Sequence, residues 1–198
     1  MAKIKVHQKA LAHLSRGLYR SPASALKELI SNAWDANATW VRVNTGYPTF
    51  LQLSVQDNGK GFSREEFERL MGGGIGNSGK QPQESTLDYG RPTIGRLGIG
   101  MLGIAQICGS FTIVSKQANN RGFKAKVNLY DLLREKTDEQ APEVVETTSG
   151  EITEVDVGEY HFEDFDPSLY KYGTTISSDD VHPVFCQIIS RIFRTSAI

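Results

Sequence analysis

Glu28 and Asn32 lie four positions apart in the sequence, a spacing that lets both side chains act at one site. Residues four apart on an α-helix project from the same face. A glutamate can orient or deprotonate a water molecule, and an asparagine side-chain oxygen suits Mg²⁺ held beside phosphate oxygens and waters. Taken alone, such a pair is more often a solvated polar face, so its interpretation depends on the motifs that accompany it.

Asp57-x-Gly59-x-Gly61 follows a strand-like stretch and is a second candidate site. A carboxylate at a strand end accepts hydrogen bonds, and the exocyclic amine of adenine is a suitable donor. The two glycines permit positive φ angles and close approach of a ligand to the backbone. The same segment contains Asp57-Asn58-Gly59, an ordinary turn signal, which is the simpler interpretation when it is taken alone.

Two further segments could contact a nucleotide. Gly95-Arg-Leu-Gly-Ile-Gly100 precedes an apolar stretch, and the free N–H groups at a helix start bind phosphate. It is not a P-loop, because no Gly-Lys-Ser/Thr follows, and it is not a dinucleotide fingerprint, because no strand stands directly before it. Gly173-Thr174 places a hydroxyl on a late strand, where it could bind a base or a bridging water.

The elements that must position these residues follow from periodicity and capping signals. Helical spacing covers residues 6–18, and Ser21-Pro22 marks the start of a second helix that extends to about Asn37. The apolar face predicted for this second helix consists of Leu26, Leu29, Ile30, Ala33 and Trp34. Alternation predicts strands over residues 40–43 and 50–56, paired as a hairpin.

The later part of the chain predicts one more short helix, a long polar segment and a series of strands. Ser63 and Glu66 form a capping box for a helix to about Leu70. Residues 72–98 are rich in glycine and polar residues, which is typical of a functional lid or a disordered segment. A buried helix over 99–108 with Gly109 as its C-cap comes next. The remaining predicted elements are strands over 110–116, 122–130, 151–159 and 171–177 and a helix over 179–194. This order indicates an α+β fold rather than regular βαβ alternation.

Composition limits the class of protein. The 198 residues fit one domain, and 22 basic side chains nearly balance 23 acidic ones, so no basic excess points to nucleic acid. Cys108 and Cys186 lack the spacing of a zinc site, and both are expected to be buried thiols. We find no signal peptide and no apolar run long enough for a membrane span, and therefore expect a cytoplasmic protein.

Taken in order, ExxxN, DxGxG, GxxGxG and the late Gly-Thr resemble the GHKL superfamily of gyrases, heat-shock chaperones, histidine kinases and MutL ATPases. Glu28-Leu-Ile-Ser-Asn-Ala-Trp-Asp-Ala and Ile94-Gly-Arg-Leu-Gly-Ile-Gly-Met are similar to the large heat-shock chaperones. Asp35-Ala-Asn-Ala-Thr is similar to the MutL and MORC branches. The resemblance implies the Bergerat fold: a two-layer α/β sandwich whose mixed, mostly antiparallel sheet has helices on one face and an ATP lid.

The resemblance also implies roles for individual residues. Glu28 would be the general base, Asn32 would coordinate Mg²⁺, and Asp57 would bind the adenine amine with Thr174 assisting through water. Gly59 and Gly61 would let the base approach. The other nucleotide-contacting residues implied are Asp35, the lid residues Asn77, Ser78 and Lys80, and the phosphate-loop residues Gly95, Leu97, Gly98, Ile99 and Gly100. The expected cofactors are ATP and Mg²⁺.

Several alternatives for function remain open. Glu28 favours hydrolysis, because histidine kinases usually have Asn at this position. The family often has a following domain and a nucleotide-dependent dimer, so residues 1–198 are expected to be the N-terminal part of a longer ATPase. A nucleotide-gated binding module that does not hydrolyse ATP is one alternative. The ATPase domain of a DNA-processing protein is another, and it rests on Asp35-Ala-Asn-Ala-Thr alone. The sequence gives no role for the acidic insertion over 131–165.

Overall fold

The computed structural model describes residues 1–7, 21–75, 100–119, 121–130 and 154–195. The strands in this part of the chain are β1 (Ala2–His7), β2 (Val41–Asn44), β3 (Leu53–Asp57), β4 (Gly72–Ile75), β5 (Ser110–Lys116), β6 (Gly122–Leu129), β7 (Glu154–Glu163) and β8 (Gly173–Ser178). The helices are α2 (Pro22–Asp35), α3 (Arg64–Met71) and α4 (Pro183–Thr195), with 3-10 turns η2 (Gly100–Gln106) and η4 (Pro167–Leu169).

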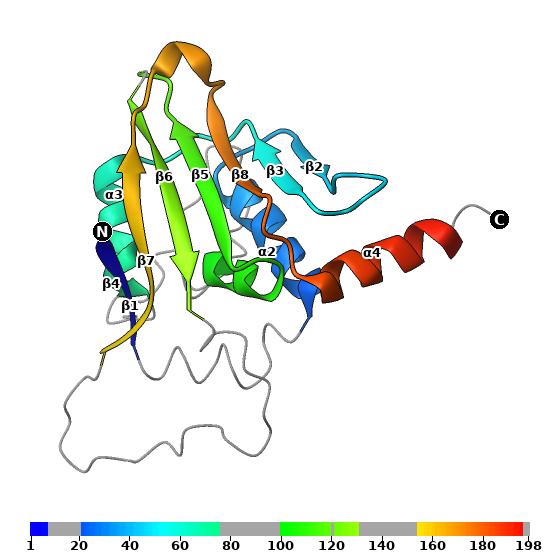
Figure 1. The fold of residues 1–198 in the computed structure, drawn as a ribbon. Helices are drawn as coiled ribbons and strands as arrows, with labels where there is room; N and C mark the ends of the chain where they lie inside the picture. The colour runs from blue at the N-terminus through cyan, green and yellow to red at the C-terminus, as the bar shows by residue number, and fades with distance from the viewer. Residues whose placement is uncertain (8–20, 76–99, 120, 131–153, 196–198) are drawn as a thin grey trace.

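One sheet contains all of these strands, in the order β2-β3-β8-β5-β6-β7-β1-β4. Every neighbouring pair is antiparallel except β1 and β4, which are parallel. The helices α2 and α3 and the turn η2 cover one face, while α4 extends away from the sheet (Figure 1). This arrangement confirms the predicted α+β class, with a mixed, mostly antiparallel sheet and helices on one face.

Alternation along the strands decides which side chains meet the helices. In β5 and β6 the residues that face the helices are buried, and the intervening ones, such as Thr112 and Lys126, face the open side. The aromatic rings of Phe67, Phe123 and Phe162 pack together on the helical side, with Phe67 and Phe123 centroids 4.8 Å apart. This core attaches α3 to the middle of the sheet.

The start of α2 agrees with its sequence signal. Ser21 is the N-cap, its hydroxyl accepts a hydrogen bond from the Ser24 N–H at 3.2 Å, and Pro22 occupies the first turn. The predicted apolar face is partly wrong, because Ile30 and Trp34 are 42% and 39% exposed. The stripe that packs inward is shifted to Ala25, Leu29 and Ala33, which recur at the spacing of one helix face.

Several predicted boundaries are corrected. Residues 6 and 7 belong to β1 rather than to a helix, and residues 72–75 form β4 rather than the start of a lid. β3 begins at Leu53 instead of residue 50, because Phe50 has a φ of 58° and cannot continue a strand. The helix predicted over 99–108 is a 3-10 turn that ends at Gln106, before Gly109.

Other predictions are confirmed or fall outside the described residues. The β2–β3 hairpin, the β5–β6 pair and the capping box of Ser63 and Glu66 are all present. The strand predicted over 151–159 is β7, and the last helix is α4, which begins at Pro183 after a bridge between Cys108 and Val181. The helix predicted over 8–18, most of the predicted lid and the insertion up to residue 153 lie outside the described part.

Candidate functional site

Asp57 is a buried carboxylate at the end of β3. Because side chains alternate along a strand, it lies on the same face as Leu53 and Val55, beneath the helices, and it is only 9% exposed. Its Oδ1 accepts hydrogen bonds from the N–H groups of Gly59 at 2.8 Å and Thr174 at 3.3 Å. Burial raises the pKa of Asp57, and the two backbone N–H groups only partly oppose that shift.

The second oxygen of Asp57 distinguishes this group from a purely structural aspartate. Within the described residues, both hydrogen bonds to the carboxylate are accepted by Oδ1, and the carboxylate has no ion-pair partner. Oδ2 is therefore available to accept a hydrogen bond from a ligand. A buried acceptor with this geometry suits a donor such as an amine.

Two glycines let chain segments meet closely around Asp57. A Cβ at Gly59 would lie 2.7 Å from the Cβ of Ala36, at the end of α2. Gly173 has a φ of 111°, and a Cβ there would fall on the backbone carbonyl oxygen of Asp57. Both glycines therefore serve the packing of the protein's own backbone, in addition to the access for a ligand that the sequence predicts for Gly59.

The end of α2 is joined directly to the segment after β3. The Lys60 N–H donates to the Ala36 carbonyl at 2.8 Å. The side-chain oxygen of Asn58 accepts from the N–H groups of Thr39 at 2.9 Å and Trp40 at 3.1 Å, and its amide donates to the Thr39 hydroxyl at 2.8 Å. Asn58 thus ties the Asp57–Gly61 segment to the chain that leaves α2. In the sequence, Asn58 is recognisable only as part of a turn signal.

Glu28 and Asn32 lie on a line along α2 that ends at Ala36. The three positions are separated by four residues each, so they share one helix face. At a rise of 1.5 Å per residue, Glu28 lies about 12 Å along the axis from Ala36, which contacts Gly59. Glu28 is half-buried and Asn32 is exposed, and within the described residues neither side chain makes a hydrogen bond or ion pair. Both side chains are therefore available to a ligand.

Of the third predicted motif, Gly95 to Gly100, the structure describes only the last residue. Gly100 begins η2, a buried turn that packs against α2. The turn η2 is therefore next to the helix that carries Glu28 and Asn32. The other residues predicted in this part of the chain lie outside the described residues: Asn77, Ser78, Lys80, Gly95, Leu97, Gly98 and Ile99. Asp35 is the last residue of α2.

Thr174 and Ser115 complete the wall beside Asp57. Thr174 pairs with Ser115 across β8 and β5, and their hydroxyl oxygens are 3.5 Å apart. Ser115 is fully buried and its oxygen accepts from the Phe62 N–H at 2.8 Å. Sequence reasoning missed Ser115, because a serine in an alternating strand carries no signal of its partner 59 positions away.

A family model described as "Histidine kinase-, DNA gyrase B-, and HSP90-like ATPase" matches residues 19–160, which include the complete first three motifs. The chain belongs to this family. Membership in this ATPase family indicates that the domain binds ATP, and suggests that it can hydrolyse it. The family's described members include the heat-shock chaperones and gyrases that the motifs resemble.

The names of several curated relatives of this GHKL domain describe proteins that act on DNA. The "Putative type II restriction enzyme HgiDII" of Herpetosiphon aurantiacus is 35% identical over 132 residues, which are 61% of this chain and 21% of that protein. The "DNA mismatch repair protein MutL" of Exiguobacterium sp. is 31% identical over 103 residues, 52% of this chain and 16% of that protein. MutL of Lactobacillus delbrueckii subsp. bulgaricus is 45% identical over 47 residues, which are 24% of this chain and 7% of that protein. The chain spans about a fifth or less of each relative.

The donor set of this GHKL domain fits Mg²⁺ bound together with phosphates. Among the described residues, no group of three His, Cys, Asp or Glu side chains could hold a metal by itself. Mg²⁺ usually takes one or two protein oxygens plus phosphate oxygens and waters, and the exposed Asn32 amide offers one such oxygen. Of the helices in the described part, none is long and apolar enough to cross a membrane.

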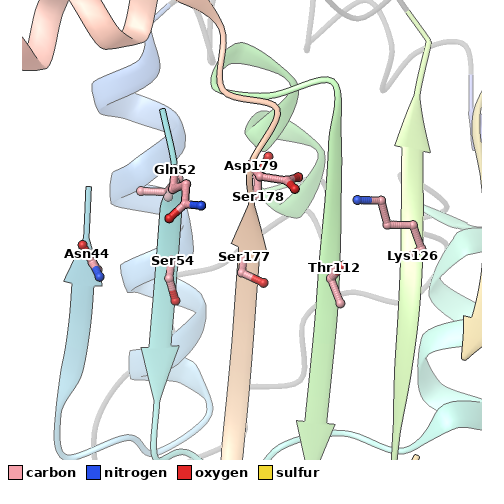
Figure 2. Close-up of a pocket in the computed structure, with 9 residues that line it drawn as sticks. Asn44, Gln52, Ser54, Thr112, Lys126, Ser177, Ser178 and Asp179 are labelled. Atoms are coloured by element: carbon pink, nitrogen blue, oxygen red, sulfur yellow. The ribbon is translucent and has the colours of Figure 1, made fainter. Parts of the chain in front are cut away.

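A hollow of about 300 Å³ lies on the opposite, open face of the sheet. Figure 2 shows its polar lining across β2, β3, β8, β5 and β6, with Lys126 and Asp179 among the side chains. It contains none of the residues of the four motifs. Asp57 faces the helices instead, so this hollow and the predicted nucleotide site are on different faces.

Proposed function

We propose that this domain binds ATP with Mg²⁺ and hydrolyses it to ADP and phosphate. The observation that carries the proposal is the buried Asp57, whose Oδ2 is available at one end of a line that continues along α2 through Asn32 to Glu28. An adenine amine at Asp57 would direct the triphosphate along this helix. The adenine would then contact Asp57, and the phosphates would lie near Asn32 and Glu28.

Glu28 acts in this proposal as the general base. Its carboxylate orients and deprotonates the water that attacks the terminal phosphorus, and a positioned base of this kind contributes about 10²- to 10⁴-fold to a rate. Asn32 holds the cation and so fixes the triphosphate relative to Glu28. When bound, Mg²⁺ neutralises phosphate charge and orients the phosphate oxygens.

The remaining predicted contacts belong to the same proposal. The backbone N–H groups of 95–100 hold the phosphates at the start of η2. Asn77, Ser78 and Lys80 act as lid contacts, and Asp35 contacts the nucleotide from the last position of α2. Lid closure over ATP would drive conformational change and nucleotide-dependent pairing in a longer protein with C-terminal domains.

Calorimetric titration with ATP tests the proposal directly. The wild-type chain should bind ATP more tightly with Mg²⁺ than with EDTA, and Asn32→Ala should remove most of this difference. Asn44→Ala is the matched control, because Asn44 is an exposed asparagine on the opposite side of the sheet. Binding that is absent in the wild type, or insensitive to both Mg²⁺ and Asn32→Ala, would contradict the assigned site.

Phosphate release separates hydrolysis from nucleotide-gated binding. If the protein is a hydrolase, its phosphate release should depend on Glu28. The measurement uses the full-length protein, because such domains often need their dimer and following domain for turnover. Tight binding without any release would support the non-hydrolysing module instead.

We further propose that the full-length protein processes DNA. The named relatives, a putative restriction enzyme and MutL proteins, favour this setting. The net charge of −1 gives no support for a DNA contact from this domain itself. Phosphate release by the full-length protein should rise when duplex DNA is added, and an unchanged rate at low salt would count against a DNA-coupled ATPase.

A further inference from the structure

Ser115 links two segments of the nucleotide site that are far apart in the sequence. Its side chain is fully buried, and its oxygen accepts the Phe62 N–H at 2.8 Å, directly after Gly61. A Cβ at Gly61 would lie 3.0 Å from the same oxygen. On its other side, Ser115 Oγ is 3.5 Å from the Thr174 hydroxyl, which follows Gly173 at Asp57. Ser115 therefore stands behind the wall formed by Gly61, Asp57 and Thr174.

The placement of hydrogens follows from what each buried hydroxyl can satisfy. Ser115 Oγ already accepts one hydrogen bond, so its own hydrogen needs an acceptor, and among the described residues Thr174 Oγ1 is the acceptor within reach. If Thr174 donated to Ser115 instead, the Ser115 hydrogen would be buried without an acceptor, which is costly. Among the described residues this favours Ser115 as the donor, which leaves the hydrogen of Thr174 for another acceptor.

We propose that Ser115 is a positioning residue that makes Thr174 a hydrogen-bond donor to the base and thereby selects adenine. This inference rests on the proposed ATP site. Asp57 Oδ2 accepts and Thr174 donates, directly or through one water. The edge of adenine carries the complementary pair, an amine that donates and N1 that accepts. Hypoxanthine, the base of ITP, presents the opposite pair at that edge: a carbonyl that accepts and an N1–H that donates.

The ratio of dissociation constants for ITP and ATP measures this selection. Ser115→Ala frees the Thr174 hydroxyl to rotate, so the ratio should fall by about fivefold, the scale of one neutral hydrogen bond. The effect is limited to this size because 3.5 Å is long for a bond between hydroxyls. Ser115→Cys fills the space of the hydroxyl with a slightly larger thiol that donates weakly, so it should lower the ratio similarly without a cavity. Thr112→Ala, on the open face of the same strand, should leave the ratio unchanged.

A double-mutant comparison shows whether Ser115 acts through Thr174. Thr174→Val removes the hydroxyl, so adding Ser115→Ala to it should change the ITP to ATP ratio no further. The inference is overturned if Ser115→Ala weakens both nucleotides equally, leaves the ratio unchanged, or still lowers it in the Thr174→Val background. If thermal melting shows that Ser115→Ala does not fold, the ITP to ATP ratio of Ser115→Cys tests the inference instead. If the wild type binds neither nucleotide, the proposed function fails; if it binds ATP through Asp57 with an unaltered ratio in the Ser115 variants, only this inference fails.

Discussion

Asp57→Asn is expected to weaken ATP binding strongly while raising thermal stability. The amide oxygen can still accept the N–H groups of Gly59 and Thr174, so the local backbone keeps its bonds. The other end of the side chain becomes an N–H donor that meets the adenine amine donor. Since a hydrogen bond to a charged group contributes about 1.5–3 kcal/mol, the dissociation constant should rise about 10- to 150-fold.

The stability effect has the opposite sign. Because burial raises the pKa of Asp57, the folded state binds more protons than the unfolded state at pH values just above the usual range of a carboxyl. Stability therefore falls as pH rises through that interval, and above it the ionised carboxylate destabilises the fold. Asn carries no charge, so Asp57→Asn should melt at a higher temperature than the wild type at pH 7 in the absence of nucleotide, and the difference should shrink at acidic pH.

Isothermal titration calorimetry with MgATP and thermal melting at pH 7 and pH 4 measure both effects. Asp179→Asn is the matched control, because it removes a carboxylate on the open face and should change neither property. A dissociation constant within twofold of the wild type would refute the adenine contact. A lower melting temperature at pH 7 would refute the argument that the buried charge destabilises the empty domain.

Three further predictions concern single positions. Glu28→Ala should have a dissociation constant for MgATP within about threefold of the wild type yet release phosphate about 10²- to 10⁴-fold more slowly. Lys27→Ala, at the neighbouring exposed residue, is the control. Rapid turnover by Glu28→Ala would exclude Glu28 as the general base. Gly173→Ala forces a Cβ onto the Asp57 carbonyl at a φ of 111° and should lower the free energy of unfolding in urea by about 1–3 kcal/mol. Gly109→Ala should cost less, because the close contact of its Cβ, at 2.9 Å, is with the movable Asp180 carboxylate; equal costs would argue against the close packing at Gly173. Burial raises the pKa of Cys108 to about 12, so iodoacetamide at pH 8 should modify Cys108 only after unfolding, as mass spectrometry of its peptide can show. Rapid modification of Cys108 in the native protein would contradict its burial.

The local signals in the sequence predicted much of the fold. The Ser21 cap, the capping box of Ser63 and Glu66 and the strand pair β5–β6 all involve residues that are close in the chain. A cap needs its partner within three positions, and a hairpin is directed by its turn. Such features form wherever the segment folds, so a sequence alone is enough to find them.

Other elements depended on contacts that the sequence does not encode nearby. β1 has only Ile4 and Val6 as buried alternating residues, and its partners β7 and β4 are far along the chain. The inward face of α2 is set by η2 and the sheet rather than by hydrophobicity. For this reason Ile30 and Trp34 are exposed although both are apolar.

By itself, the sequence determined the order of the four motifs and the residue types at Glu28, Asn32, Asp57 and Thr174, and these indicated a nucleotide site. Only the tertiary structure decided that Oδ1 of Asp57 is occupied while Oδ2 is available, and that Ser115 lies behind Thr174. The physical reason is that hydrogen bonds across a sheet join positions regardless of the length of chain between them. Ser115 and Thr174 pair because β5 and β8 are neighbours in the sheet, and neither residue type reveals that neighbour.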